Sequence, residues 1–143
     1  MRKKIYGFVP ARGGSTRVPR KNIKEIGGVP LFLRACYNLN QVWPKDHIIV
    51  DSDDEEILEL AKKNGFGTLI RPENLATNAA DGNAFFAWEA SNFPDADIYI
   101  QHLPPMPFCS KTTLERALNA IVKEEYDSIV AVGKEHFYMW DDE

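Results

Sequence analysis

A short basic segment with paired glycines is the part of this sequence best suited to chemistry. Residues 10–22 combine two glycines and four cations, in a chain whose net charge is −4: Gly13, Gly14, Arg12, Arg17, Arg20 and Lys21. Glycine lets backbone N–H groups approach a phosphate, and Arg and Lys neutralise its oxygens through charge-assisted hydrogen bonds. The segment has neither GxGxxG nor the P-loop spacing, so a dinucleotide-binding motif and a P-loop NTPase are not supported. It predicts a local polyphosphate site, and a solvated basic loop is the alternative.

An acidic group, Asp51, Asp53 and Asp54, could be taken for a magnesium site, because hard carboxylates suit that ion. Acidic residues also favour the start of a helix, and Ser52-x-x-Glu55 has the form of a capping box. We therefore interpret the group as a helix start and assign no metal ligand.

Two further features have simple structural interpretations. His102 could act as a base near neutral pH, but a single histidine without an identifiable partner is more often a hydrogen-bonding loop residue. The aromatic cluster of Phe85, Phe86 and Trp88 is most simply the core face of a helix, and we assign it no role in binding.

The composition limits the class of protein. A chain of 143 residues with 44% hydrophobic content can bury one core. The net charge of −4 argues against a general nucleic-acid binder, and no apolar run approaches the ~20 residues of a membrane span. Cys36 and Cys109 have no metal-ligand spacing, and a reducing cytoplasm fits them best. We expect one globular domain with no membrane segment.

Apolar runs and turn signals alternate along the chain in a regular order. The expected strands are 5–9, 48–50, 68–70, 98–101 and 128–132. The expected helices run from 30 to 39, from the 52–55 box to Gly65, from 84 to a stop at Pro94, and from a Thr112-x-x-Glu115 capping box to 122. Strands separated by helices form a mostly parallel sheet with helices on both faces, and ligands collect beyond the carboxyl ends of its strands. The loops after residues 9, 50, 70 and 101 should therefore lie together.

Several ordered motifs resemble one known family. Ala11-Arg12-Gly13-Gly14-Ser15 and Pro19-Arg20-Lys21-Asn22-Ile23 resemble the signature of the acylneuraminate cytidylyltransferases, the CMP-sialic acid synthetases. The family's next segments are similar to Gly27-Gly28-x-Pro30-Leu31, to 53–57 and to Arg71-Pro72-Glu73-x-Leu75-Ala76-Thr77. The resemblance covers residues 5 to about 133. It implies an α/β fold, a three-layer Rossmann-like arrangement of the nucleotide-diphosphosugar transferase type with a mostly parallel sheet, here truncated.

The resemblance also implies an activity. It is the transfer of CMP from CTP to the anomeric hydroxyl of an α-keto acid sugar, with release of pyrophosphate and a requirement for Mg²⁺, in a cytoplasmic enzyme that can be a homodimer. Arg12 and Lys21 would be catalytic at the triphosphate, residues 71–82 would form the base pocket, and Gln101 would face nucleotide or sugar. The implied nucleotide-binding residues are Ala11, Arg12, Gly13, Gly14, Ser15, Lys21, Asn22, Arg71, Ala80, Gly82 and Gln101.

The sequence departs from the family pattern in two ways. Where the family has Gln-Pro-Thr-Ser-Pro, this chain has Gln101-His102-Leu103-Pro104-Pro105, so two hydroxyls near the acceptor sugar are missing and its identity stays open. The family's second half, with its acidic magnesium ligands and dimerisation subdomain, has no counterpart, so residues 1–143 are expected to be one nucleotide-binding α/β domain that is incomplete at its C-terminus. The alternatives are an octulosonate cytidylyltransferase, a non-catalytic nucleotide-binding module, and an assembly protein that uses the apolar run 137–140.

Overall fold

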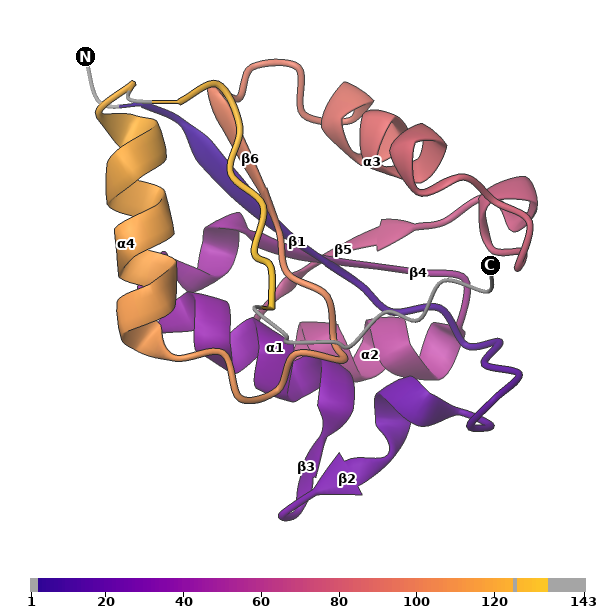
Figure 1. Ribbon diagram of the computed structural model, residues 1–143. Helices are drawn as coiled ribbons and strands as arrows, with labels where there is room; N and C mark the ends of the chain where they lie inside the picture. The colour runs from indigo at the N-terminus through magenta and orange to yellow at the C-terminus, as the bar shows by residue number, and fades with distance from the viewer. Residues whose placement is uncertain (1–2, 125, 134–143) are drawn as a thin grey trace, which may run out of the picture.

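Four parallel strands form the central sheet of the computed structural model, which describes residues 3–124 and 126–133 (Figure 1). Their order across the sheet is β5-β4-β1-β6. The strands are β1 (Ile5–Pro10), β4 (Ile48–Ser52), β5 (Gly67–Ile70) and β6 (Ile98–Gln101). All three pairings are parallel, as the alternation of strands and helices predicts.

Helices cover both faces of this sheet. The helices are α1 (Leu31–Asn40), α2 (Glu55–Lys63), α3 (Gly82–Ser91) and α4 (Lys111–Val122), and short 3₁₀ turns lie at Lys21–Ile23, Lys45–His47 and Glu73–Leu75. Figure 1 shows α1 and α2 on one side of the sheet and α3 on the other. This arrangement confirms the expected three-layer α/β fold. Within residues 3–124 and 126–133, no helix has the length and apolar character to cross a membrane.

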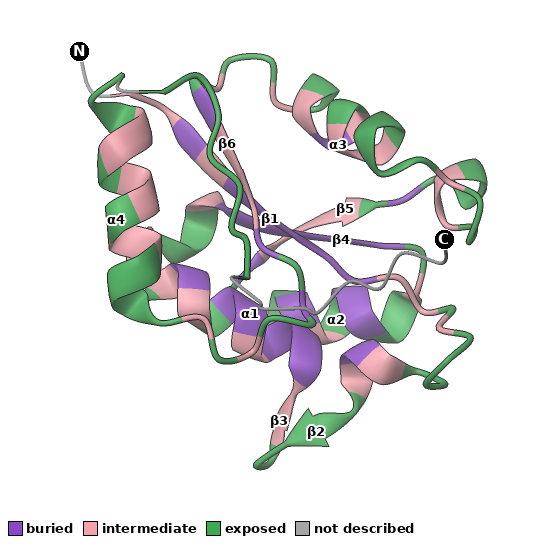
Figure 2. Cartoon of the chain, viewed as in Figure 1, coloured by how far each residue is buried: buried purple, intermediate pink, exposed green. Residues whose placement is uncertain are grey.

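The two faces of the sheet bury different side chains, because successive residues of a strand point in opposite directions. Val9 and Val50 are fully buried in the apolar cluster formed with α1 and α2. Phe8, the neighbour of Val9, instead meets Phe93 after α3, with ring centroids 5.5 Å apart. In Figure 2 the buried residues concentrate along β1, β4 and the inner sides of α1 and α2. By the same alternation Asp51, which follows Val50, belongs to the face that α3 covers.

The N-caps expected from the two capping boxes are each wrong by two residues. Asp54, not Ser52, is the N-cap of α2, and its carboxylate accepts a hydrogen bond from the Ile57 N–H. Ser52 remains in β4, where its hydroxyl donates to the Ala11 carbonyl at 2.7 Å. Likewise Ser110, not Thr112, is the N-cap of α4. In both cases more than one residue that can cap a helix lies within two positions of the true N-cap, so the motif alone does not choose between them.

Two other differences concern strands. The segment 128–132 is exposed and has no strand partner among the described residues, and β-forming side chains do not make a strand without one. A small antiparallel hairpin of β2 (Glu25–Ile26) and β3 (Val29–Pro30) was not predicted, although Gly27 and Gly28, both at positive φ, are a typical hairpin turn. The apolar run 137–140 lies outside the described residues.

The third helix also differs from expectation. Phe85, Phe86 and Trp88 are only half-buried, so they are not the core residues that we predicted. The one residue of α3 that is fully buried is Glu89. A carboxyl group, rather than an aromatic ring, therefore occupies the centre of the contact between this helix and the sheet.

Candidate functional site

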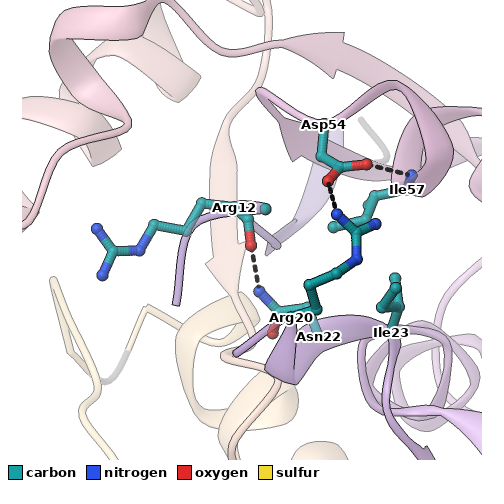
Figure 3. Close-up of a pocket in the computed structure, with 7 residues that line it drawn as sticks. Arg12, Arg20, Asn22, Ile23, Asp54 and Ile57 are labelled. Carbon is teal, nitrogen blue, oxygen red and sulfur yellow. Dashed lines mark hydrogen bonds and ion pairs between the residues drawn. The ribbon is translucent and has the colours of Figure 1, made fainter. Parts of the chain in front are cut away.

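The basic glycine loop, residues 10–22, is held against the start of α2 by hydrogen bonds and ion pairs. The Gly13 N–H donates to Asp53 Oδ1 at 2.9 Å, and Arg20 forms ion pairs with Asp54 at 3.2 Å and Glu56 at 2.6 Å. Within the loop, Asn22 Nδ2 donates to the Arg12 carbonyl at 2.8 Å (Figure 3). These contacts fix the loop across the carboxyl ends of β1 and β4, where the parallel fold predicts a ligand.

Arg12 links this loop to the segment that follows β5. Its carbonyl faces Asn22, while its guanidinium extends away from the hollow drawn in Figure 3. The guanidinium donates to the Ala76 carbonyl at 3.4 Å and to Asn78 Oδ1. The side chain therefore forms a wall between two hollows, one on each side of the loop.

Only one of the two hollows has room for a ligand. The one in Figure 3, beside Arg20, Asn22 and Asp54, holds no water-sized space, whereas the other encloses about 220 Å³. The larger cavity is lined by Arg12, Arg71, Leu75, Thr77, Asn78, Ala80 and Phe85. Its volume lies below the ~300 to 1,000 Å³ of pockets for drug-sized molecules, so it suits one part of a nucleotide, such as the base.

The structure brings some of the predicted site residues together and separates others. Arg12, Arg71 and Ala80 line the cavity, whereas Gly13 and Asn22 line the smaller hollow on the other side of Arg12. Ala11 is fully buried under the loop, while Gly14 is exposed and Ser15 and Lys21 are half-buried on it. Gly82 begins α3, and Gln101 does not line the cavity.

Four lining residues were not named individually from the sequence. Leu75 and Thr77 belong to a quoted motif, and both lie with Asn78 inside the predicted base-pocket segment 71–82. Phe85 was assigned to the core, but its ring lies 5.0 Å from the Arg71 guanidinium, at a distance typical of a cation–π contact. Phe85 could have been assigned to the pocket from the sequence, because it is an aromatic residue about one helical turn after the irregular polar segment 71–81.

Arg71 has a buried acidic partner. Its Nε donates to Asp51 Oδ1 at 2.6 Å, and its Nη2 forms an ion pair with the same oxygen. Arg71 is 6% exposed and Asp51 is fully buried in β4. Our interpretation of Asp51 as part of a helix start is therefore wrong, because the alternation of the strand turns this side chain inward and a charge there requires a partner.

The described carboxylates do not fit a magnesium site. Asp51 is paired with Arg71, Asp53 accepts from Gly13, and Asp54 both caps α2 and pairs with Arg20. Within residues 3–124 and 126–133, no group of three or more His, Cys, Asp or Glu side chains is placed to hold a metal ion. We therefore derive no step of a reaction through Mg²⁺ held by these residues.

His102 is buried at the end of β6, and burial lowers the pKa of its imidazole below the ordinary value. Its Nε2 has no hydrogen-bond partner among the described residues, and it does not line the cavity. The structure therefore gives no support to a role for His102 as a base.

The two glycines of the loop are expected to respond differently to substitution. A Cβ at Gly13 would lie 2.5 Å from Asp54 Oδ2 and 2.8 Å from Asp54 Cβ, whereas a Cβ at Gly14 would meet nothing within 4 Å. Gly13→Ala should therefore displace the cap of α2 and lower the free energy of unfolding by about 1 to 3 kcal/mol. Gly14→Ala, the matched control, should change it by less than about 0.5 kcal/mol. Urea denaturation measures both, and equal midpoints would show that the loop does not pack against Asp54 as described.

Comparison with known proteins gives a consistent result. A family model described as "Cytidylyltransferase" matches residues 6–138. A pseudaminic acid cytidylyltransferase of Campylobacter jejuni is 43% identical over 78 residues, which cover 54% of this chain and 34% of the relative. An N-acylneuraminate cytidylyltransferase of Escherichia coli is 30% identical over 135 residues, covering 94% of this chain and 32% of the relative.

Solved structures show the same fold. A CMP:2-keto-3-deoxy-manno-octonic acid synthetase complexed with CTP superposes with a TM-score of 0.73 at 22% identity, over 85% of this chain and 48% of that one. The chain thus spans about a third of the length of the curated relatives cited and about half of this structure.

Proposed function

The chain belongs to the cytidylyltransferase family, and we propose that the Arg12 loop and the adjacent cavity bind CTP. The reaction that we propose for the enzyme is the transfer of CMP to the anomeric hydroxyl of an acidic α-keto sugar, with release of pyrophosphate. The observation that carries this proposal is the position of Arg12, whose backbone belongs to the glycine loop and whose guanidinium forms a wall of the cavity. One residue can therefore contact both the phosphates and the nucleoside.

The cavity volume suggests how CTP would lie. The base would enter the space of about 220 Å³, and we propose that backbone groups within residues 71–82 supply donors and acceptors to its edge. The triphosphate would lie outside it, along Gly13, Gly14 and Ser15, with Arg12 and Lys21 neutralising its oxygens. Attack on the α-phosphorus increases the charge on nonbridging and leaving oxygens, so these two cations would act mainly by electrostatic stabilisation.

Asn22 and Gln101 would act differently from the other predicted residues. Asn22 Nδ2 is occupied by the Arg12 carbonyl, so we propose that Asn22 orients the loop as well as the nucleotide. Gln101 Nε2 donates to Glu89 at 2.7 Å, which leaves only its remaining amide atoms for nucleotide or sugar. We propose a sialic acid or related nonulosonate as the acceptor, in a cytoplasmic enzyme that forms homodimers, with an octulosonate as the alternative acceptor.

Arg12→Ala tests the nucleotide site. Loss of a charge-assisted hydrogen bond should cost about 1.5 to 3 kcal/mol, or about 10-fold to 150-fold in the dissociation constant of CTP. Isothermal titration calorimetry on the 143-residue chain measures this constant, and binding should weaken as salt rises. Arg17→Ala is the matched control, because Arg17 carries the same charge on the same loop and is exposed outside the cavity.

The outcomes separate three interpretations. An equal loss in both variants would indicate a diffuse charge effect and contradict the role of Arg12. Preference for ATP or GTP over CTP in competition would contradict the cytosine pocket, because mismatched donors and acceptors leave buried polar groups unpaired. The second candidate function is a non-catalytic nucleotide-binding module. It would be favoured if the chain binds CTP but releases no pyrophosphate when it is given Mg²⁺ and N-acetylneuraminate, a pseudaminate-type sugar or an octulosonate. The observation in favour of that candidate is that Asp51, Asp53 and Asp54 all bind other residues of the protein.

A further inference from the structure

A buried polar cluster lies directly behind the wall of the cavity. Its members come from four separate elements that meet at the carboxyl end of the sheet: Asp51 of β4, Arg71 after β5, Glu89 of α3 and Gln101 of β6. Asp51 and Glu89 are fully buried, and Arg71 alone reaches the cavity. The function proposed above uses Arg71 but gives no role to the groups that hold it.

Hydrogen bonds from the protein occupy one oxygen of each carboxyl group in the cluster. Gln101 Nε2 donates to Glu89 Oε2 at 2.7 Å, and Asp51 Oδ1 accepts from Arg71 Nε at 2.6 Å. The two carboxyl groups are neighbours, since Asp51 contributes to the raised pKa of Glu89. If both carboxyls are ionised, Asp51 Oδ2 and Glu89 Oε1 are buried with no donor within the described residues. A single proton between the two carboxyls supplies the missing donor.

The count of charges leads to the same conclusion. The cluster has two carboxyl groups and one guanidinium, and a second buried carboxylate would have no cation of its own. Burial first, and then the neighbouring Asp51, raise the pKa of Glu89 to about 10, against the smaller opposite effects of Gln101 and Arg71. Glu89 is therefore the member that carries the proton at neutral pH.

We propose that Glu89 is a positioning residue for the nucleotide cavity: as a neutral carboxylic acid it donates a hydrogen bond to Asp51 and so fixes the carboxylate that holds Arg71 in the cavity wall. Phe85 packs against the guanidinium, so Arg71 is held by a carboxylate and by an aromatic ring. Loss of the proton would place two like charges side by side, so the Glu89 and Asp51 carboxylates would move apart and Arg71 would lose its fixed position. The proposal rests on the proposed function only for the identity of the ligand.

The first experiment needs no ligand. Nuclear magnetic resonance of the ¹⁵N-labelled chain at pH 7 should show a slowly exchanging Nε–H signal for Arg71, assigned by its loss in Arg71→Lys. Glu89→Gln keeps the shape and supplies an N–H donor to Asp51, so the signal should persist. Glu89→Leu removes the donor and should broaden or abolish it. On raising the pH, the wild-type signal should be lost as Glu89 ionises, while that of Glu89→Gln should persist beyond that pH.

The second experiment measures CTP affinity at pH 7.5 by calorimetry. Glu89→Gln should bind within about 3-fold of the wild type, and Glu89→Leu at least 10-fold more weakly. Glu59→Gln on α2, an exposed position, is the control that should change nothing. A circular dichroism spectrum and a cooperative unfolding transition establish that each variant is folded.

The two experiments distinguish failure of the positioning role from failure of the proposed nucleotide site. If the chain binds no CTP but the Arg71 signal follows Glu89 as described, the nucleotide proposal is wrong and the positioning role stands. If the signal persists in Glu89→Leu, or is lost in Glu89→Gln while that variant is folded, the positioning role is wrong. Should Glu89→Leu not fold, Glu89→Gln and the pH series still decide between these outcomes.

Discussion

Replacement of Asp51 by alanine should lower the free energy of unfolding by about 3 to 5 kcal/mol, because it leaves the Arg71 guanidinium buried without its partner. Domains of this kind are stabilised by only about 5 to 15 kcal/mol, so this variant should lose a large fraction of its stability. The same substitution also removes the carboxylate to which we propose that Glu89 donates a hydrogen bond. Urea denaturation followed by circular dichroism measures the change.

Two further sets of variants test whether the loss of stability depends on the burial of the ion pair. Asp95→Ala removes an ion pair of the same kind, with Lys4, in which both side chains are well exposed, and it should have little effect on the midpoint. The double variant Asp51→Leu with Arg71→Met removes both charges and should be more stable than Asp51→Ala. If Asp51→Ala and Asp95→Ala shift the midpoint equally, the pair behaves as a surface contact and the buried cluster is wrong.

The positions of the strands could be predicted because each strand is a short β-forming run bounded by a turn signal. Four such runs separated by helices cannot pair as hairpins, so they are expected to form a parallel sheet. The carboxyl ends of β1, β4, β5 and β6 then lie at one edge of that sheet. The segment 128–132 has the same composition, yet it has no strand partner among the described residues. Whether such a run forms a strand depends on a neighbouring strand with which it can pair, and the sequence of the run alone does not show this.

The components of the site were predictable to different degrees. The glycine loop and Arg12 combine rare residue types in one local segment, so the sequence is sufficient to single them out. The partnership of Asp51, Arg71 and Glu89 is formed by three elements far apart in the chain, and no spacing signals it. One local signal was nevertheless present, because Glu89 is the only charged residue of α3 and therefore the one that needs a partner when that helix is packed.

The motif at 52–55 shows why a strong local pattern can mislead. Ser52 and Glu55 match a capping box, and this match led to the interpretation of Asp51 as part of a helix start. The strand instead continues to Ser52, whose hydroxyl reaches the Ala11 carbonyl and thereby ties β4 to the glycine loop. The alternation of β4 contained the better information, since it places Val50 and Asp51 on opposite faces of the sheet.

The stability of the wild-type chain should fall as the pH rises from 7.5 to 9, and Glu89→Gln should remove this dependence. The pKa of Glu89 is raised from an ordinary 4.5 to about 10, so between these values the folded chain keeps a proton that the unfolded chain has lost. Stability from this group is thus fully present below about pH 4.5 and is lost progressively toward pH 10. One proton corresponds to a slope of at most about 1.4 kcal/mol per pH unit.

Two other buried groups, His102 and Cys36, have shifted pKa values, and their effects on this slope can be separated from that of Glu89. Burial lowers the pKa of His102, so its contribution has the opposite sign and is confined to pH values near and below its ordinary 6.5. Burial raises the pKa of Cys36, whose effect adds to the slope only near and above pH 9, where the unfolded thiol ionises. Both groups are unchanged in Glu89→Gln, so subtraction of the two stability curves isolates Glu89.

Urea denaturation at half-unit intervals of pH therefore gives a direct answer. The difference in unfolding free energy between Glu89→Gln and the wild type should increase with pH across the window, and Glu59→Gln should run parallel to the wild type because that carboxyl is exposed. Parallel curves for Glu89→Gln and the wild type would mean that Glu89 is already ionised at pH 7.5. The buried cluster would then carry a second negative charge, and the position of Arg71 in the cavity wall would require a different explanation.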